Sequence, residues 1–271
     1  MALMEGKRGL IVGVANDKSI AWGIAKALSS EGAELAFTYL NESLEKRVRP
    51  LADSLGSNII LPCDVGKDED IEKLFEDLGE EWDSLDFLVH SVAFANKDEL
   101  RGAFYNTSRE GFSLACDISA YSLVALTRGA LPLMEGRKGS IMTLTYYGSE
   151  KVMPNYNVMG VAKSALETSV RYLAADLGPL GHRVNAISAG PVRTLAAAGI
   201  GDFRKIQLVN ELRSPAGRLV TLDEIGSTAV YLASDGSTGM TGEVLHVDCG
   251  FHAMTLSVKE ALHMASKESD K

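Results

Sequence analysis

Short apolar runs alternate along this chain with longer segments of helical periodicity, and this alternation limits the folds that the chain can adopt. The expected strands cover residues 9–14, 34–39, 58–62, 85–90, 139–144, 183–187 and 243–247, and the expected helices cover residues 20–31, 42–55, 67–81, 109–134, 155–177 and 222–233. The runs are short enough to be strands buried on both faces of a sheet. Alternating strands and helices form parallel sheets, because each connection crosses back over one face. We predict the α/β class: a Rossmann-type, doubly wound, seven-stranded parallel sheet with helices on both faces.

No linker and no shift in composition divides the chain, so we predict a single domain. With 271 residues, 46% of them hydrophobic, the chain can bury one full core. We expect the domain to span residues 1–256, followed by a charged C-terminal tail at 257–271. A less regular segment at about 192–217 is interpreted as a small lid over an apolar substrate, since residues 195–200 are small and apolar. A packing helix without a special role is the alternative.

Composition excludes several classes of function. The net charge of −9 and the pI of about 5.1 argue against a broad nucleic-acid-binding surface. Cys63, Cys116 and Cys249 are odd in number and far apart, so we expect no disulfide framework, no metal site and a reducing cytoplasm. No signal-peptide core opens the chain and no run of about 18 apolar residues occurs, so we expect no contact with a membrane.

The first expected strand is followed by a glycine loop and a helix, a combination that binds anions. Gly13 allows a tight turn, Ser19 supplies a hydroxyl, and the N–H groups and dipole of the next helix favour phosphate. The loop is longer than the G-x-G-x-x-G form, so a purely structural turn is the alternative. After the second strand no Arg or Lys precedes Lys46 to bind a 2′-phosphate, which favours NADH over NADPH.

Polar and small residues also follow the third, fourth and sixth expected strands. Asp64 is placed to bind an adenine edge, with an Asx turn or helix cap as the alternative. Residues 91–95 are small enough to lie against a cofactor, whereas His90 is interpreted as a hydrogen-bonded histidine at a strand end. Residues 190–194 form a Gly-Pro turn whose amides and threonine hydroxyl suit a phosphate. Because ligands bind at the carboxyl ends of parallel strands, these loops predict one site.

A tyrosine and a lysine share one face of the expected fifth helix. Tyr156 and Lys163 are seven residues apart, which returns the lysine to within about 20° of the tyrosine, roughly two turns along the helix. An ammonium in this position favours the tyrosinate form and strengthens the phenol as a hydrogen-bond donor. It also suits the hydroxyls of a ligand. An ordinary amphipathic helix with a buried tyrosine is the alternative.

Together these residues match a known family. The chain resembles the short-chain dehydrogenase/reductases and, within them, the bacterial enoyl-acyl-carrier-protein reductases of fatty-acid synthesis. The resemblance covers about residues 6–251 and is most specific at residues 154–163, 183–191, 193–197 and 202–205. Most members of the superfamily place the catalytic tyrosine four residues before the lysine, and a serine about 13 residues before that tyrosine. Met159 and Tyr146 occupy these positions here, which separates the chain from the alcohol-forming members.

The resemblance implies conjugate reduction of a trans-2-enoyl thioester, carried on acyl carrier protein, to the saturated acyl thioester, with NADH/NAD+ as the cofactor. It implies that Tyr156 donates a hydrogen bond to the thioester oxygen as negative charge develops there, which is oxyanion-type stabilisation. Lys163 then holds the nicotinamide ribose, and Tyr146, also counted as catalytic, flanks the acyl chain. A cytoplasmic homotetramer is implied as well.

The site residues that the resemblance implies fall into two further sets. The expected contacts to the cofactor are Gly13, Ser19, Ile20, Leu40, Asp64, Val65, Val92, Lys163, Val192, Arg193, Thr194, Leu195 and Ala196. The expected contacts to the substrate are Ala95, Tyr146 and Tyr156.

Two departures from the family pattern affect the details. Leu40 stands where the NADH-using members usually have glutamine, so the contact to the adenosine ribose has to differ. Ala93 stands where glycine is frequent, and its methyl group is expected to weaken binding of the diaryl-ether inhibitors that act on relatives.

Two other functions remain open at this stage. One is a 3-oxoacyl thioester or other ketone reductase of the same fold, against which Met159 argues, and the other is a non-catalytic dinucleotide sensor. An acidic carrier protein also needs a basic patch on this acidic chain. Arg204 and Lys205 are the candidates, with two ordinary solvated side chains as the alternative.

Overall fold

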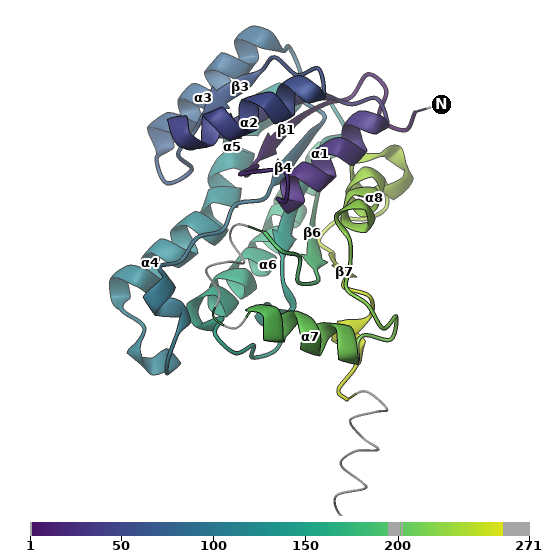
Figure 1. Cartoon of the computed structure of the whole chain (residues 1–271). Coiled ribbons are helices and arrows are strands. Elements are labelled where there is room, and N and C mark those ends of the chain that lie inside the picture. Colours follow the sequence, from purple (N-terminus) through teal and green to yellow (C-terminus); the bar gives the residue numbers. More distant parts are fainter. Residues whose placement is uncertain (1, 195–200, 202, 257–271) are drawn as a thin grey trace, which may run out of the picture.

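The computed structural model describes residues 2–194, 201 and 203–256 (Figure 1). Residues 195–200 of the expected lid and the expected tail, 257–271, lie outside this part of the chain. The strands are β1 (Arg8–Val12), β2 (Glu34–Tyr39), β3 (Ile60–Pro62), β4 (Phe87–His90), β5 (Ser140–Thr145), β6 (Arg183–Ala189) and β7 (Val244–Val247). The α-helices are α1 (Ile20–Ser30), α2 (Glu42–Ser54), α3 (Asp68–Glu81), α4 (Arg109–Cys116), α5 (Ser122–Met134), α6 (Asn157–Leu177), α7 (Phe203–Arg213) and α8 (Leu222–Ala233).

The strands form one seven-stranded sheet in the order β3-β2-β1-β4-β5-β6-β7. Every neighbouring pair is parallel. From β1 the chain proceeds outward to β2 and β3, and then returns to the other side of β1 as β4, with Val12 in register with His90. The predicted fold class is therefore confirmed, and the reversal of strand order places the ligand-binding crevice of such sheets beside β1 and β4.

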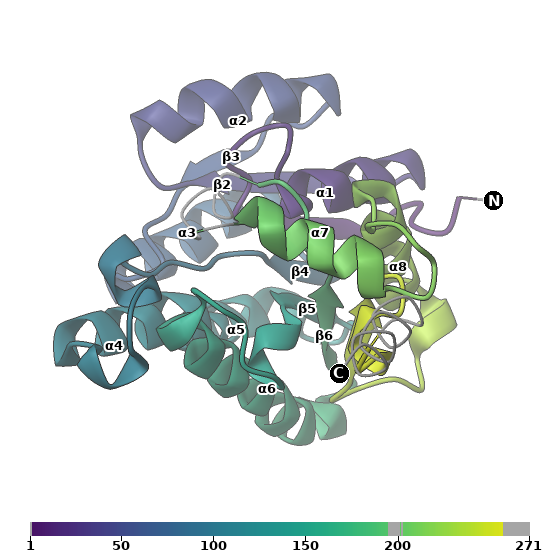
Figure 2. The same ribbon diagram turned by 60° about the horizontal axis from the view of Figure 1, so that its bottom comes forward.

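The helices cover the sheet as two layers (Figure 2). One apolar core contains residues of α1, α2 and α8, including Trp22, Leu28 and Ile225, packed against Phe37 and other strand residues. The other contains residues of α3, α5 and α6 packed against the opposite face. Burial of the sheet on both faces explains why its strands read as continuous apolar runs instead of alternating ones.

The expected helix at 109–134 is interrupted. A π-helical turn (η3, Asp117–Tyr121) separates α4 from α5. Within it Ser119 is fully buried and exchanges hydrogen bonds with the backbone of Phe94, in the loop after β4. Among the described residues, Arg109–Met134 is the one stretch long and apolar enough to cross a membrane, and half of its most apolar part is buried in the protein. Core helices of globular proteins meet the same criterion.

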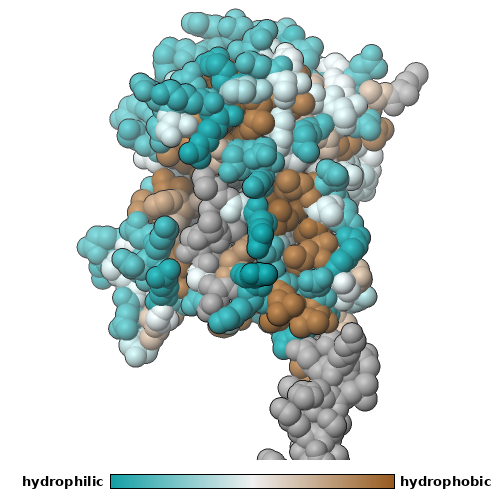
Figure 3. All heavy atoms as spheres, in the orientation of Figure 1, coloured by the Kyte–Doolittle hydropathy of each residue, from teal (hydrophilic) through white to brown (hydrophobic). Residues whose placement is uncertain are grey.

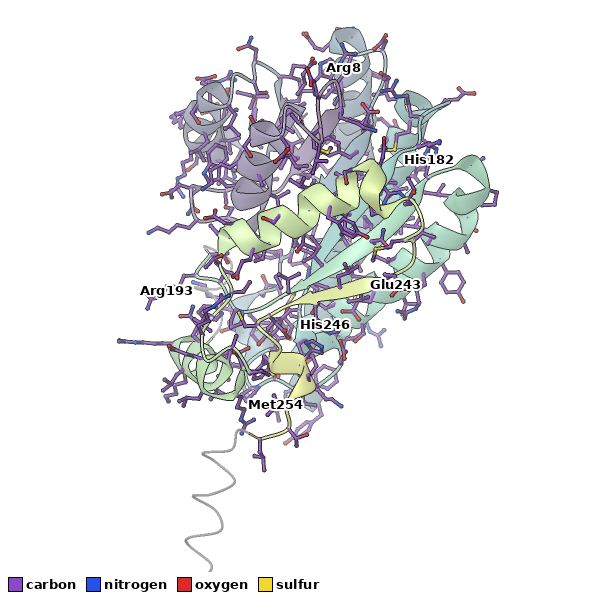
Figure 4. All side chains as sticks on the ribbon, turned by 90° about the vertical axis from the view of Figure 1, so that its right-hand side faces the viewer. Arg8, His182, Arg193, Glu243, His246 and Met254 are labelled. Atoms are coloured by element: carbon purple, nitrogen blue, oxygen red, sulfur yellow. The ribbon has the colours of Figure 1, made fainter. Side chains whose placement is uncertain are left out.

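One end of the sheet collects the loops that the sequence analysis singled out. Figure 4 shows Arg8, His182 and Glu243 toward the end where the strands begin, and Arg193, His246 and Met254 toward the other end. Helix α7 crosses in front of the strand ends at that second side (Figure 2), and Gln207 from this helix donates to the carbonyl of Pro191. The candidate site therefore lies between the carboxyl ends of the strands and α7.

Candidate active site

Tyr156 is buried at the start of α6, and not within it. The helix begins at Asn157, so the expected start at about residue 155 is wrong by two residues, and Tyr156 occupies the cap position. The residue is 7% exposed. Its ring packs on Gly148, where a Cβ atom would lie only 2.5 Å from a ring carbon. A side chain at position 148 would therefore displace the phenol.

Two asparagines with left-handed backbone flank Tyr156. Asn155 has φ of 60° and Asn157 has φ of 33°. Asparagine is one of the few non-glycine residues that adopt this region at modest cost. Their side-chain amides donate to the carbonyls of Gly201 and Gly102, at 3.1 and 3.2 Å. The backbone on both sides of Tyr156 is thus anchored to two loops that are distant in the sequence. Backbone strain of this kind is typical of functional sites.

An apolar cluster joins the residues that the sequence analysis assigned to the substrate. Tyr156 and Met159 belong to its buried part, while Ala93, Ala95 and Tyr146 pack against it from two other loops. The rings of Tyr146 and Tyr156 meet edge to face with their centres 5.2 Å apart. Tyr146 therefore lies where it can flank an apolar chain that approaches Tyr156.

Burial keeps the Tyr156 phenol protonated. It raises the pKa of Tyr156 well above its ordinary value, and the neighbouring Tyr146 and the Glu167 carboxylate add to the rise. The expectation that the ammonium of Lys163 favours the tyrosinate form is therefore wrong for this structure. A protonated phenol in an apolar site is a hydrogen-bond donor, which is what an oxyanion requires.

Lys163 is 5% exposed and makes one direct contact that explains its position. Its Nζ donates to the carbonyl of Leu144, at the end of β5, over 2.7 Å. Burial lowers the pKa of Lys163 to about 8, while the carboxylate of Glu167, one turn later on α6, counteracts this shift. The side chain thus carries its charge at neutral pH, in the crevice beside β4 and β5.

His90 is a hydrogen-bonded core histidine, which confirms its interpretation from the sequence. Its Nδ1 lies 2.7 Å from Oγ1 of Thr143 and its Nε2 lies 2.8 Å from Oγ of Ser122. Ser122 donates its proton to the carbonyl of Ile118, so His90 has to donate to Ser122 and accept from Thr143. Burial, together with the nearby Lys163 ammonium, lowers the pKa of His90 to about 3, so the ring is neutral.

The loop after β1 has the shape expected of a phosphate-binding turn. Gly13 has φ of 111°, and a Cβ atom there would lie 2.1 Å from the carbonyl oxygen of Ser91, in the loop after β4. Ser19 occupies the N-cap position of α1, but its Oγ makes no bond to the helix and accepts from the N–H groups of Ala15 and Asn16 in the loop, at 3.0 and 3.1 Å. The Ser19 hydroxyl therefore shapes the loop, beyond any contact that it makes to a ligand.

The other expected cofactor residues lie at the same edge of the sheet. Asp64 accepts from the N–H of Gly66, so the Asx turn is present, and its contact to adenine stays a prediction. Leu40 is half-exposed where β2 ends. The remaining described members are partly buried or exposed in the loops that leave β3, β4 and β6, or open α1: Ile20, Val65, Val92, Val192, Arg193 and Thr194. Leu195 and Ala196 lie outside the described residues.

Helix α7 borders the site with an unusual polar pair. The Tyr146 hydroxyl and the Asn210 carbonyl oxygen are both buried, and neither has a hydrogen-bond partner within the described ranges. Burial raises the pKa of Tyr146 to about 12, and the nearby Asn210 side chain partly counteracts this rise. The two groups thus approach each other without the geometry of a hydrogen bond.

The outer side of α7 forms an open hollow of about 590 Å³, which we call the α7 hollow. Its lining includes Arg193, Arg204, Lys205, Leu208, Glu211 and Leu219. Figure 4 shows Arg193 beside this helix. In the space-filling view, apolar side chains gather beside hydrophilic ones on the lower part of the face where α7 lies (Figure 3). The candidate basic residues Arg204 and Lys205 thus line a surface that adjoins the site.

Sequence reasoning missed several residues that shape this site. Asn155 and Asn157 carry a weak signal, since an asparagine on each side of a candidate catalytic residue suggests left-handed backbone. Ser119, Asn210 and Glu167 become recognisable only when the fold brings them to the site. Glu167 stands one turn after Lys163, a spacing at which helical side chains of opposite charge interact.

The residues at the crevice fit a dinucleotide. Gly13 leaves its turn free of a side chain at the point where strand order reverses, α1 presents its N-terminus there, and Lys163 supplies a buried ammonium. Such a turn accepts a pyrophosphate, and an ammonium suits ribose hydroxyls.

Comparisons with known proteins agree with this arrangement. The family model described as enoyl-(acyl carrier protein) reductase matches residues 13–252. The NADH-type enoyl-[acyl-carrier-protein] reductase of Aquifex aeolicus is 56% identical over 260 residues, 96% of each chain. The crystal structure of the Anaplasma phagocytophilum reductase in complex with NAD has a TM-score of 0.91 at 56% identity, covering 94% of this chain and 97% of that one. The Bacillus cereus reductase with NADP+ and an indole naphthyridinone has a TM-score of 0.92 at 52% identity, covering 94% and 100%. The fold, the matched family model and relatives of this identity over nearly full length together show that the chain belongs to the enoyl-[acyl-carrier-protein] reductase family.

Proposed function

We propose that this chain catalyses the NADH-dependent reduction of the trans-2 double bond of enoyl thioesters in bacterial fatty-acid synthesis. The observation that carries the proposal is the position of the phenol. Tyr156 is protonated, is buried in the apolar cluster and precedes Lys163 by seven residues, while Met159 fills the position that a ketone reductase gives to its tyrosine. This arrangement supports a hydrogen bond from the Tyr156 hydroxyl to the thioester oxygen, which lies beyond the carbon that accepts the hydride. A ketone reductase would instead need its tyrosine at the carbonyl that is itself reduced.

Each site residue has a separate task in this mechanism. The bound cofactor supplies a hydride to the β-carbon of the substrate. Tyr156 donates a hydrogen bond to the thioester oxygen, where the enolate charge develops, and its low-dielectric surroundings strengthen this interaction. Lys163 holds the hydroxyls of the nicotinamide ribose. Tyr146, Ala93 and Ala95 border the acyl chain and exclude water from it.

The cofactor contacts predicted from the sequence complete the proposed site. They comprise Gly13, Ser19, Ile20, Leu40, Asp64, Val65, Val92, Val192, Arg193 and Thr194 at the carboxyl edge of the sheet. A neutral Leu40 offers no partner for a 2′-phosphate, which supports NADH. NADPH still has to be tested because the related Bacillus cereus enzyme was crystallised with NADP+.

We further propose that the substrate is carried on acyl carrier protein, docked at the α7 hollow. Arg193, Arg204 and Lys205 bring positive charge to a chain of net charge −9, next to the apolar Leu208 and Leu219. Such a patch steers an acidic partner toward the site. A cytoplasmic homotetramer and inhibition by diaryl ethers are carried over from the family as proposals.

The activity is tested by mixing the protein with crotonyl-coenzyme A and NADH, and then NADPH, while following the reduced-nicotinamide absorbance. We expect rapid loss of absorbance with NADH and slower loss with NADPH. Turnover of 3-oxoacyl but not enoyl thioesters would instead assign a ketone reductase. Tight NADH binding without turnover of any thioester would assign a sensor.

A further inference from the structure

Glu167 is a buried carboxylate that the proposed mechanism leaves unused. It lies on α6 and is 8% exposed. Its Oε1 accepts from Oγ1 of Thr145 over 2.6 Å and from Oγ of Ser149 over 2.5 Å. A carboxylate in the interior is costly unless hydrogen bonds and an opposite charge compensate it. The hydroxyls supply the hydrogen bonds.

The opposite charge comes from Lys163, which lies one turn before Glu167 on the same face of α6. Its ammonium can donate three hydrogen bonds, but the one it makes to a described group is to the Leu144 carbonyl. His90 and Tyr156 supply no negative charge that would stabilise the ammonium: His90 is neutral, with a pKa of about 3, and Tyr156 keeps its proton. Glu167 is the carboxylate that raises the pKa of Lys163 against the effect of burial.

The same carboxylate fixes the segment that carries Tyr146. Thr145 and Ser149 lie on either side of this tyrosine, and both donate to one oxygen of Glu167. The Ser149 backbone carbonyl in turn accepts from Ser164 of α6. Through these bonds the turn between β5 and α6 is tied to the helix that carries Lys163.

We propose that Glu167 is a positioning residue of the reaction: it keeps Lys163 charged in a buried site and holds the 145–149 turn so that Tyr146 faces Tyr156. This inference rests on the proposed role of Lys163 in binding the cofactor. Burial is the main reason why Tyr156 keeps its proton, and the negative charge of Glu167 adds to this effect.

Glu167→Gln separates the charge of this residue from its shape. The amide keeps an oxygen that accepts from Thr145 and Ser149, but it no longer favours the ammonium. We would measure the dissociation constant of NADH between pH 6.5 and 9.5 for the full-length protein. The wild type should lose affinity above about pH 8, as Lys163 deprotonates. In Glu167→Gln the loss should begin about one pH unit lower. NADH should then bind about fivefold more weakly at pH 8, close to tenfold more weakly at pH 9, and nearly normally at pH 6.5.

Two control variants make the result specific. Asp176→Asn removes the same charge from an exposed position of α6 and should leave the profile unchanged. Glu167→Asp retains the charge on a shorter side chain, so its midpoint should stay within half a unit of the wild type. Three results would overturn the inference. The Glu167→Gln profile could superimpose on that of the wild type, or Glu167→Gln could weaken binding equally at every pH. The Glu167→Asp midpoint could also shift as far as that of Glu167→Gln.

Lys163→Ala distinguishes this inference from the proposed function. If Lys163→Ala weakens NADH binding while Glu167→Gln shows no shift, only the role of Glu167 is lost. If Lys163→Ala binds NADH as the wild type does, the proposed role of Lys163 fails, and that of Glu167 fails with it.

Discussion

Removal of the Tyr156 hydroxyl is the most direct perturbation of the proposed mechanism. In Tyr156→Phe the ring remains, so its edge-to-face contact with Tyr146 and its packing on Gly148 persist. What is lost is one donor in a residue that is 7% exposed. Donors of this kind contribute about 10²–10³ in kcat, or roughly 2.7–4 kcal/mol, because they act in a site from which water is excluded. We expect the upper part of that range, since burial keeps the phenol protonated and away from water.

Steady-state kinetics with crotonyl-coenzyme A and longer enoyl thioesters would separate kcat from KM. NADH binding and the thermal midpoint should stay close to the wild type. Tyr146→Phe is the control for stability, because its hydroxyl is buried and has no hydrogen-bond partner in the described part of the chain. Removing an unpaired buried hydroxyl should leave stability unchanged or raise it by about 1 kcal/mol. Full kcat of Tyr156→Phe on several chain lengths would refute the oxyanion role.

Three further outcomes are expected. The pKa of Lys163 is about 8, below its ordinary 10.5 because the residue is buried, so the ammonium is lost above pH 8 and the dissociation constant of NADH should rise about tenfold per pH unit there. Lys163→Arg should abolish that dependence, and a pH-independent wild type would contradict it. Replacing both Arg204 and Lys205 by Glu should raise KM severalfold for the carrier-bound substrate and leave KM for the coenzyme A analogue unchanged. The control Lys26→Glu with Lys138→Glu should change neither KM. An equal effect on both substrates would refute the docking surface. Ala93→Gly should bind diaryl ethers more tightly by removing a methyl group from the cluster around Tyr156, and equal inhibition constants for both proteins would show that the methyl group is irrelevant.

Much of the fold follows from local patterns. The apolar runs identify all seven strands, and the capping residues and glycines locate the ends of most helices to within one or two residues. The π-helical turn at Asp117–Tyr121 was not predictable from local patterns. It accompanies two contacts with distant residues: Ser119 bonds to the backbone of Phe94 in the loop after β4, and Ser122, which opens α5, bonds to His90 at the end of β4. The start of α6 was misplaced for a similar reason, since Asn155 and Asn157 adopt left-handed backbone while anchored to residues 201 and 102.

The sequence by itself determined the order of the elements, the parallel sheet and the spacing of Tyr156 and Lys163, because each depends on residues close together along the chain. Only the tertiary structure decided the protonation states. A phenol seven residues before an ammonium predicted an acidic tyrosine, yet burial raises the pKa of Tyr156 and lowers that of Lys163. Desolvation and the charge of Glu167 depend on how the helix packs against the sheet, and the spacing of residues along one helix contains no information about that packing.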